Sequence, residues 1–203
     1  MSLGSMIRDP QSEFRPNWLG SSRVDACQRV RNAMADAVGL LPVAEAAAET
    51  ILGVLGAATV SVTLLDHERD EYWDLVSVGA LMPGDERFPR NARYPASGFP
   101  EATKRLLNED GYLSLDSSDR VLVEYHTHWP GDINIGSIMG APIVAGAEVR
   151  GEILIARDRR APRFSCLDLD LAREMSTVLG DRLPSLLGEG DEQSLSRTLC
   201  MST

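Results

Sequence analysis

The sharpest polar feature of the sequence is a pair of histidines, His126 and His128, separated by a single threonine. On a β-strand, residues two apart face the same side, so both imidazoles could meet a metal ion or one could bind a haem iron. No third ligand has a suitable spacing, because His67 lies on an acidic turn and Asp132 is merely nearby. The pattern therefore favours a polar pair at the surface or at the rim of a pocket, and we predict no metal site.

The aromatic residues are concentrated in the middle of the chain, where eight of the eleven fall between Tyr72 and Trp129. Rigid rings that line a concavity suit a planar ligand, whereas the same rings also suit a core whose strands contain few aromatics. Trp73 lies in an apolar strand and fits the core interpretation as well. The candidate ligand-binding residues are Trp73, Tyr94, Phe99, Tyr125, His128, Trp129 and Ile138.

The three cysteines, Cys27, Cys166 and Cys200, lie far apart and form no C-x-x-C pair. Small secreted domains use dense, even-numbered cysteines, so this spacing predicts reduced thiols in a cytoplasmic protein. Cys166 follows Ser165, an expected helix cap, and a helix N-terminus can lower the pKa of a thiol. A small thiol without a chemical role accounts for Cys166 better.

Motifs for hydrolysis or phosphate chemistry are absent from the sequence, which has no G-x-S-x-G elbow, no P-loop and no H-E-x-x-H. Scattered acids such as Glu101, Glu109, Asp110 and Asp116 form no pair that spacing alone assigns to acid–base chemistry. We therefore predict no catalytic residue and expect a binding protein rather than an enzyme.

The composition is that of an ordinary globular protein, with 43 % hydrophobic and 25 % charged residues among 203. A net charge of −10, with acidic and basic residues interspersed, argues against nucleic acid, because phosphate binding needs a basic face. There is neither a signal-peptide pattern nor an apolar run long enough to span a bilayer, so we expect no membrane partner. We expect an N-terminal arm at 1–22, one domain at 23–187 and a C-terminal tail at 188–203.

Hydrophobic periodicity predicts the elements that must position the candidate residues. Steps of three and four between apolar residues predict helices over 24–38 and, opened by Pro42, up to residue 55. A period of two then predicts a β-hairpin over 58–79. Clustered prolines predict a long loop over 80–96.

The middle of the chain after this loop is mostly irregular. We expect a short helix over 99–108, a short strand over 112–115 and an irregular segment over 116–135. Within that segment, one helical turn is expected over 121–125.

The last part of the domain has the clearest pattern. Residues 135–158 contain two apolar runs around a glycine turn, which predicts a second hairpin. Ser165, with Asp168 three residues on, can cap a final helix. The apolar stripe of that helix is Leu171, Met175, Val178, Leu179 and Leu183. The whole order predicts an α+β fold, in which an antiparallel sheet has the N- and C-terminal helices on one face and loops over part of the other.

Three segments of the sequence resemble the GAF family. Residues 141–158, A-P-I-V-A-G-A-E-V-R-G-E-I-L-I-A-R-D, resemble the family's final hairpin. The P-R-F-S-C-L-D-L-D-L-A that follows is similar to its Phe-Ser pattern and closing helix, and A-A-T-V-S-V-T-L-L-D at 57–66 is similar to its first strand. The resemblance spans about residues 23–187, although 80–135 matches only in layout. It implies a GAF-like, PAS-related antiparallel sheet of five or six strands, with a ligand pocket roofed by the variable middle.

Specialised members of that family offer further comparisons. The Asn-Lys-Phe-Asp-Glu signature of cyclic-nucleotide-binding members cannot be assembled here. Bilin-binding members need a pocket cysteine, and no cysteine falls within 80–135. The same absence counts against the small redox enzymes of the free methionine sulfoxide reductase type. Some GAF sensors bind haem, but no residue pattern here points to it, so the cofactor stays unassigned.

The resemblance implies two main functions. One is a small-molecule-sensing domain that acts in signal transduction through a separate regulator or kinase, and the other is a protein interaction or dimerisation module without a bound ligand. The resemblance also implies a homodimer formed by the first and last helices. Their apolar stripes over 24–38 and 171–183 fit such a bundle, and they fit burial against the chain's own sheet at least as well.

Overall fold

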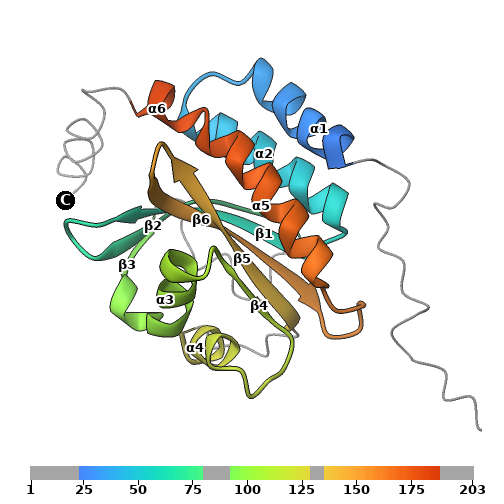
Figure 1. Cartoon of the computed structure of the whole chain (residues 1–203), viewed down its shortest axis with the longest axis vertical. Helices are drawn as coiled ribbons and strands as arrows, with labels where there is room; N and C mark the ends of the chain where they lie inside the picture. Colours follow the sequence, from blue (N-terminus) through green and yellow to red (C-terminus); the bar gives the residue numbers. More distant parts are fainter. Residues whose placement is uncertain (1–22, 80–91, 129–134, 188–203) are drawn as a thin grey trace, which may run out of the picture.

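The computed structural model describes residues 23–79, 92–128 and 135–187, which form one sheet between two layers of helices (Figure 1). Outside the described residues lie the predicted arm at 1–22, the predicted tail at 188–203, most of the predicted loop over 80–96, and Trp129.

The sheet has six strands, and both predicted hairpins are confirmed. The strands are β1 (Thr59–Asp66), β2 (Glu71–Gly79), β3 (Arg93–Pro95), β4 (Tyr112–Ser114), β5 (Ile135–Ala145) and β6 (Glu148–Asp158). Their order is β3-β2-β1-β6-β5-β4, and every neighbouring pair is antiparallel. The two hairpins, β1–β2 and β5–β6, therefore meet at the centre of the sheet. Short β3, inside the predicted loop, was not expected.

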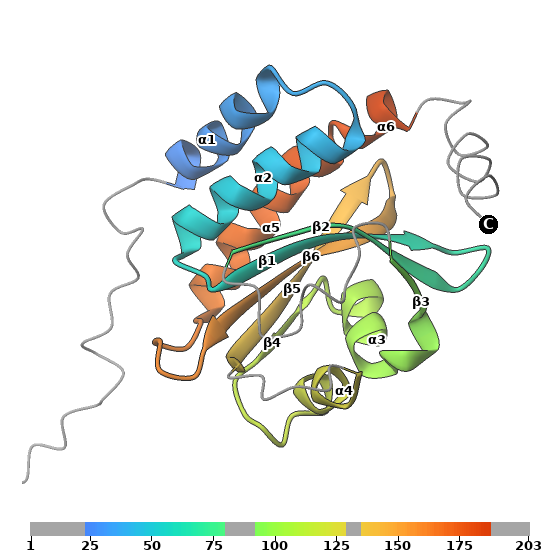
Figure 2. The ribbon, with the colours of Figure 1, turned by 180° about the vertical axis from the view of Figure 1, so that it is seen from behind.

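Helices of two kinds cover the two faces of the sheet (Figures 1 and 2). One face, which we call the helix-side face, carries the chain's terminal helices: α1 (Arg23–Ala35), α2 (Leu40–Leu55), α5 (Cys166–Gly180) and α6 (Leu183–Leu186). The other, the loop-side face, carries shorter elements: the 3-10 turn η3 (Ala96–Gly98), α3 (Pro100–Asn108) and α4 (Arg120–His128). Among the described helices, none is long and apolar enough to cross a membrane.

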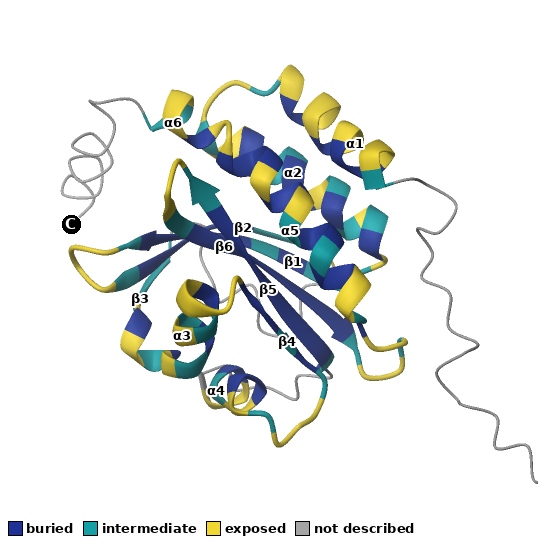
Figure 3. Ribbon diagram, in the orientation of Figure 1, coloured by how far each residue is buried: buried dark blue, intermediate teal, exposed yellow. Residues whose placement is uncertain are grey.

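A large apolar core fills the space between the sheet and the terminal helices (Figure 3). The stripe predicted for the last helix is confirmed, since all of its residues are buried. The predicted cap is confirmed as well, because Ser165 and Asp168 each accept a hydrogen bond from the other's backbone N–H at the start of α5. Side-chain periodicity was a sufficient guide wherever a long helix lies directly on the sheet.

The first helix departs from its predicted stripe at both ends. Val24 and Val38 are 75 % and 87 % exposed, and α1 ends at Ala35. The reason is that α1 packs on α2 and α5, as an outer layer, so only a narrow strip of its surface is buried (Figure 2). Its buried residues are Ala26, Cys27, Val30 and Met34.

A β-bulge in the first hairpin decides which side chains of β2 face each layer. Val62 pairs with Val76, but the next residue of β1, Thr63, pairs with Asp74, so Leu75 is an extra residue on β2. Leu75 and Val76 both join the helix-side core, while Asp74 shares the opposite face with Thr63. The bulge thus places a carboxyl group on the loop-side face.

The segment with the histidine pair is a helix, so the strand considered for it is wrong. The single turn predicted over 121–125 extends to the nine residues of α4. Residues two apart on an α-helix are about 200° apart around its axis, so the same-side argument made for a strand does not apply to this segment. His126 is exposed, and the side chain of His128 lies outside the described part of the structure.

Candidate functional site

A row of buried polar residues crosses three adjacent strands on the loop-side face. Thr63 of β1 pairs with Glu152 of β6 on one side and with Asp74 of β2 on the other. Adjacent strands lie about 4.8 Å apart, so two carboxyl groups flank one hydroxyl across roughly 10 Å of backbone. All three residues are buried, Glu152 with 3 % of its surface exposed. Burying a carboxyl group is costly unless it has hydrogen-bond partners.

Two tyrosines supply the partners of Glu152. The hydroxyl of Tyr112 donates to Oε2 and the hydroxyl of Tyr125 donates to Oε1, each at 3.1 Å, and the two hydroxyl oxygens are 2.8 Å apart. Tyr112 belongs to β4 and Tyr125 to α4, so one carboxyl group joins the middle of the sheet to its edge and to a covering helix. The ring of Tyr112 lies on Gly140, where a Cβ atom would come within 2.4 Å of the ring.

The charge of Glu152 is poised near neutral pH. Burial, opposed by the two tyrosine hydrogen bonds and assisted by the nearby Asp74, raises the pKa of Glu152 to about 7. Burial and Glu152 together raise the pKa of Tyr112 and of Tyr125, so both phenols stay protonated and donate. In the described part of the chain, no basic side chain forms a hydrogen bond or an ion pair with Glu152.

Four aromatic rings lie in series beside the polar row. The ring centroids of Tyr72 and Tyr94 are 5.7 Å apart, those of Tyr94 and Phe99 5.4 Å, and those of Phe99 and Tyr125 4.9 Å. Tyr94 also reaches the row: burial and the two carboxyl groups raise its pKa, while its hydrogen bond with Thr63 lowers it. The loop-side face therefore combines a series of aromatic rings with two buried carboxyl groups.

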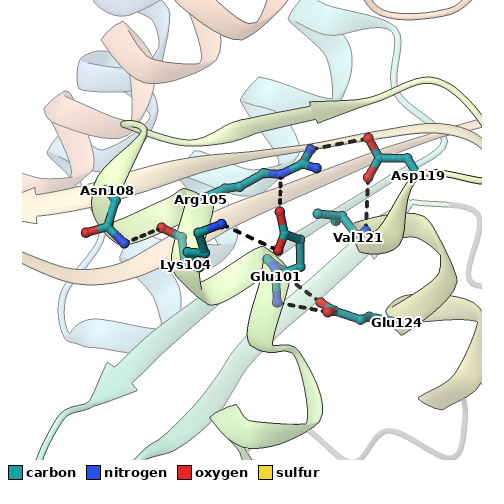
Figure 4. A network of polar contacts seen from close by, with 8 residues as sticks. Glu101, Lys104, Arg105, Asn108, Asp119, Val121 and Glu124 are labelled. Carbon is teal, nitrogen blue, oxygen red and sulfur yellow. Dashed lines mark hydrogen bonds and ion pairs between the residues drawn. The ribbon is translucent and has the colours of Figure 1, made fainter.

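The helices α3 and α4, which we call the roof helices, are joined by charged groups (Figure 4). The carboxylate of Glu124 in α4 accepts from the backbone N–H groups of Glu101 and Ala102, at 2.8 and 3.0 Å, and so caps α3. Arg105 of α3 bonds Glu101 at 3.0 Å and Asp119, just before α4, at 3.2 Å. These contacts make the two short helices one unit.

The structure brings four of the seven candidate residues together: Tyr94, Phe99, Tyr125 and Ile138 lie in one cluster on the loop-side face. Trp73 does not join them, because it follows Tyr72 on β2 and therefore points to the helix-side core. Its ring therefore lies on the face opposite the polar row. The side chain of His128 and all of Trp129 lie outside the described residues.

The residues that make this face polar, above all Glu152, were not predicted from the sequence. Glu152 alternates with Ile153 and Ile155 along β6, so it lies on the side that the roof helices cover. The sequence does contain a signal that this side is buried. Leu154 and Ala156 lie on the same side of β6 as Glu152, and both are apolar. An acidic residue at the start of an apolar side marks a buried carboxyl group. Tyr72 and Tyr112 were also missed, because each lies in a strand rather than in a loop.

The cysteines and His67 lie away from the polar row. Within the described residues, no group of three histidine, cysteine or acidic side chains is arranged to hold a metal ion. His67 lies 2.7 Å from the carbonyl oxygen of Val149 through its Nε2 atom. Cys27 is buried in the helix-side core and Cys166 is exposed at the start of α5. Neither lies at the polar row.

Comparison with known proteins identifies the fold. No protein-family model matches the sequence, and no curated protein matches it. Among solved structures, the GAF domain of a phosphoenolpyruvate-protein phosphotransferase from Acinetobacter is 17 % identical over 82 % of this chain and 96 % of its own, with a TM-score of 0.60. A phycocyanobilin-bound GAF domain from a cyanobacterial phytochrome is 15 % identical with the same coverage and a TM-score of 0.62. A GAF domain/HD domain protein from Geobacter sulfurreducens is 14 % identical over 82 % of this chain and 98 % of its own, with a TM-score of 0.57.

The chain therefore has the α+β fold of GAF domains, as the resemblance in its sequence implied. At identities of 13–17 %, structural similarity establishes a fold and leaves the function to the residues of the site.

Proposed function

We propose that this chain is a small-molecule-sensing GAF domain whose ligand binds at the loop-side face. The observation that carries the proposal is Glu152, a buried carboxyl group on a central strand that shares one face of the sheet with a second carboxyl group, Asp74. An apolar side chain at this position would stabilise the fold at least as well, because a buried acid costs free energy that hydrogen bonds only partly return. Buried acidic residues with a strongly shifted pKa are typical of binding sites. One structural neighbour is described as phycocyanobilin-bound, which supports a small-molecule site on this fold.

In this proposal the roof helices change position when the ligand binds. A ligand at Glu152 competes with the hydroxyl of Tyr125, which belongs to α4, and so displaces that helix. Glu124 and Arg105 couple α4 to α3, so both move together. The ligand shifts the population only as far as its affinities for the two arrangements differ.

The output surface in this proposal is the terminal-helix layer. β6 carries Glu152 on one face and, at the next residue, Ile153 in the core beneath α5 on the other. A change in the strand is thereby passed to α5 and α1, and a separate regulator or kinase reads it. In this proposal the protein acts in the cytoplasm and catalyses no reaction.

A protein interaction or dimerisation module is the second candidate, and the packing of the rings favours it. Centroid separations of 4.9–5.7 Å are those of aromatic rings in contact, so the four rings pack against one another. A homodimer through α1 and α5 is compatible with either function, since the outer surface of α1 exposes Val24.

Native mass spectrometry of the freshly purified protein tests the proposal. We expect an extra mass on the wild-type chain and on the Glu49→Gln control, whose exposed glutamate lies on α2. We expect the Glu152→Gln variant to lose it while its circular dichroism spectrum stays unchanged. A bare protein, before and after incubation with a cell extract, would favour the interaction module. An extra mass retained by Glu152→Gln would place the ligand elsewhere.

A further inference from the structure

Glu152, Tyr112 and Tyr125 form a closed cycle of three contacts between side-chain oxygens, which we call the carboxyl–phenol cycle. The hydroxyl oxygen of Tyr112 lies 3.1 Å from Oε2 of Glu152, that of Tyr125 lies 3.1 Å from Oε1, and the two hydroxyl oxygens lie 2.8 Å apart. All three residues are buried. The cycle joins three elements that are far apart in sequence, β4, α4 and β6.

The number of hydrogen atoms in this cycle depends on the charge of Glu152. Each phenol has one hydrogen, whatever other partners its oxygen has, and an ionised carboxylate has none. Two hydrogens fill at most two of the three contacts, so when both phenols donate to the carboxylate, their oxygens face each other without a hydrogen between them. A protonated carboxyl group supplies the third hydrogen. One phenol then accepts from Glu152 and donates to the other phenol, which donates to the second carboxyl oxygen.

The lengths of the three contacts favour the protonated form. An ionised carboxylate accepts short hydrogen bonds from hydroxyl groups, of about 2.5–2.7 Å. Both contacts with Glu152 are longer, at 3.1 Å. The shortest contact, at 2.8 Å, is the one between the two phenol oxygens, and it has the ordinary length of an O–H···O hydrogen bond. That contact is the one that lacks a hydrogen when both phenols donate to an ionised Glu152.

The second half of α4 is the part of the cycle that can move. Tyr112 is fixed, because its ring lies on Gly140, where a Cβ atom would come within 2.4 Å of it, and because β4 pairs with β5. Val121 and Leu122 anchor the first turn of α4 in the apolar cluster of the loop-side face. Among the side chains of residues 123–127, Tyr125 alone is buried. Opening of the cycle should therefore loosen residues 123–127 of α4 and leave β4 in place.

From the hydrogen count and this asymmetry we infer that the carboxyl–phenol cycle is a proton switch. Uptake of one proton from solvent by Glu152 completes the cycle and holds the second half of α4 on the sheet. Release of that proton removes one contact of the cycle and loosens the same half. The effector is the proton itself, so this inference goes beyond the proposed ligand site and requires no ligand.

The groups around Glu152 place the switch near neutral pH. Burial, opposed by the two tyrosine hydrogen bonds and assisted by Asp74, raises the pKa of Glu152 to about 7. The carboxyl group is therefore protonated below about pH 7 and ionised above it. The fraction of chains with a complete cycle should fall from about nine-tenths at pH 6 to about one-tenth at pH 8.

The other titratable groups that face Glu152 keep one charge over this range or pair with one another. Those on the neighbouring elements are Tyr72 and Asp74 of β2, Tyr94 of β3, Tyr112 of β4 and Tyr125 of α4. Burial raises the pKa of all four tyrosines, so they stay neutral. The residues paired with Glu152 on β1 and β5 are Thr63 and Pro142, which do not titrate.

The basic side chains of α3 and β6 are bound to other acids. Arg105 of α3 forms ion pairs with Glu101 and Asp119, and Arg150 of β6 forms one with Glu148 at 2.7 Å. Protonation of Glu152 is therefore governed by burial, by the two phenols and by Asp74.

NMR on the full wild-type chain, without added ligand, tests the switch. The ¹³C shift of the Glu152 carboxyl carbon, followed from pH 5 to pH 9, reports protonation. Nuclear Overhauser effects between the rings of Tyr112 and Tyr125, and backbone order parameters of residues 123–127, report the position and mobility of α4. We expect the ring-to-ring effects to fall several-fold from pH 6 to pH 8, with the same midpoint as the carboxyl shift. Order parameters should fall in this half of α4 and stay unchanged in α2 and α5.

Three variants separate the switch from a general effect of pH. In Glu152→Gln the amide group both donates and accepts, so it completes the cycle at every pH, and α4 should resemble the wild type at pH 6 even at pH 8. Glu49→Gln, on the surface of α2, should keep the wild-type response. Asp74→Asn should keep the response with its midpoint at lower pH, because Asp74 raises the pKa of Glu152.

The switch is overturned if α4 does not change between pH 6 and pH 8, or if it changes equally in Glu152→Gln. A response that Asp74→Asn abolishes would assign the titrating group to Asp74 and overturns it too. If Glu152→Gln does not fold, the wild-type titration still decides, since different midpoints for the Glu152 carboxyl group and for α4 contradict the inference. These outcomes leave the ligand site to its native mass spectra, which in turn do not affect the switch.

Discussion

The two faces of the sheet are built on different principles. The helix-side face is covered by α2 and α5, each three turns or longer, over a continuous apolar core. The loop-side face is covered by two helices of nine residues each, joined by one ion pair and by the carboxylate of Glu124, and resting on tyrosines and a buried acid. A helix that buries an apolar stripe is held by the whole stripe, whereas the roof helices depend on a few polar contacts.

This difference assigns separate roles to the faces. An apolar core of interlocking side chains has one low-energy packing, so it is stable and insensitive to pH and to ligands. A polar network changes when one member gains or loses a proton or exchanges a partner for a ligand. The helix-side face therefore maintains the fold, and the loop-side face is the one that can respond.

The largest expected effect comes from two neighbouring residues of β6 that point to opposite faces, Ile153 and Leu154. Replacing either by alanine removes buried methyl groups and should cost about 2–5 kcal/mol. We expect Ile153→Ala to lie at the upper end, because the helix-side core cannot collapse into the space. Leu154→Ala should lie at the lower end, because the short roof helices can move in. Urea denaturation measures both, and equal losses would contradict the contrast between the faces.

The second prediction concerns the pH dependence of stability that Glu152 confers. Its pKa rises from 4.5 to about 7 on folding, so the folded chain holds its proton more tightly than the unfolded chain does. The free energy of unfolding should therefore fall as pH rises from about 4.5 to 7, by on the order of 3 kcal/mol, and then level off. Glu152→Gln should remove this slope and be more stable than wild type at pH 8, with Glu49→Gln as the control. An unchanged slope in Glu152→Gln would show that another group titrates.

These two faces also explain how far the sequence could predict the structure. Along α5 and the two hairpins, the repeat of hydrophobic residues predicts which side is buried, because that side packs against one continuous apolar core. At Trp73 the alternation of residues along β2 pointed to the core, whereas the clustering of aromatic residues along the chain made Trp73 a candidate for the ligand site. Glu152 and Asp74, which flank Thr63 on either side in the sheet, are far apart in sequence. Only the register and the bulge at Leu75 bring them to one row.

A smaller effect is expected when the roof helices are uncoupled. Glu124→Ala removes the carboxylate that caps α3 and should cost about 0.5–2 kcal/mol. Amide hydrogen exchange should accelerate in α3 and α4 and stay unchanged in α2 and α5. Glu109→Ala removes an exposed glutamate next to the other end of α3 and serves as the control for lost charge. Faster exchange throughout the sheet would mean that the roof helices are part of the same cooperative unit as the core.

The smallest effect on stability, and a large one on assembly, is expected from the outer surfaces of the two layers. Val24 on α1 and Val123 on α4 are both exposed, so an aspartate at either position should change stability by no more than about 0.5 kcal/mol. If the terminal helices form a homodimer, Val24→Asp places a charge in that interface and should yield monomers in light scattering, whereas Val123→Asp should not. The reverse result would put the contact between copies on the roof helices. A ligand that moves the roof would then control assembly directly, without passing through β6 and α5.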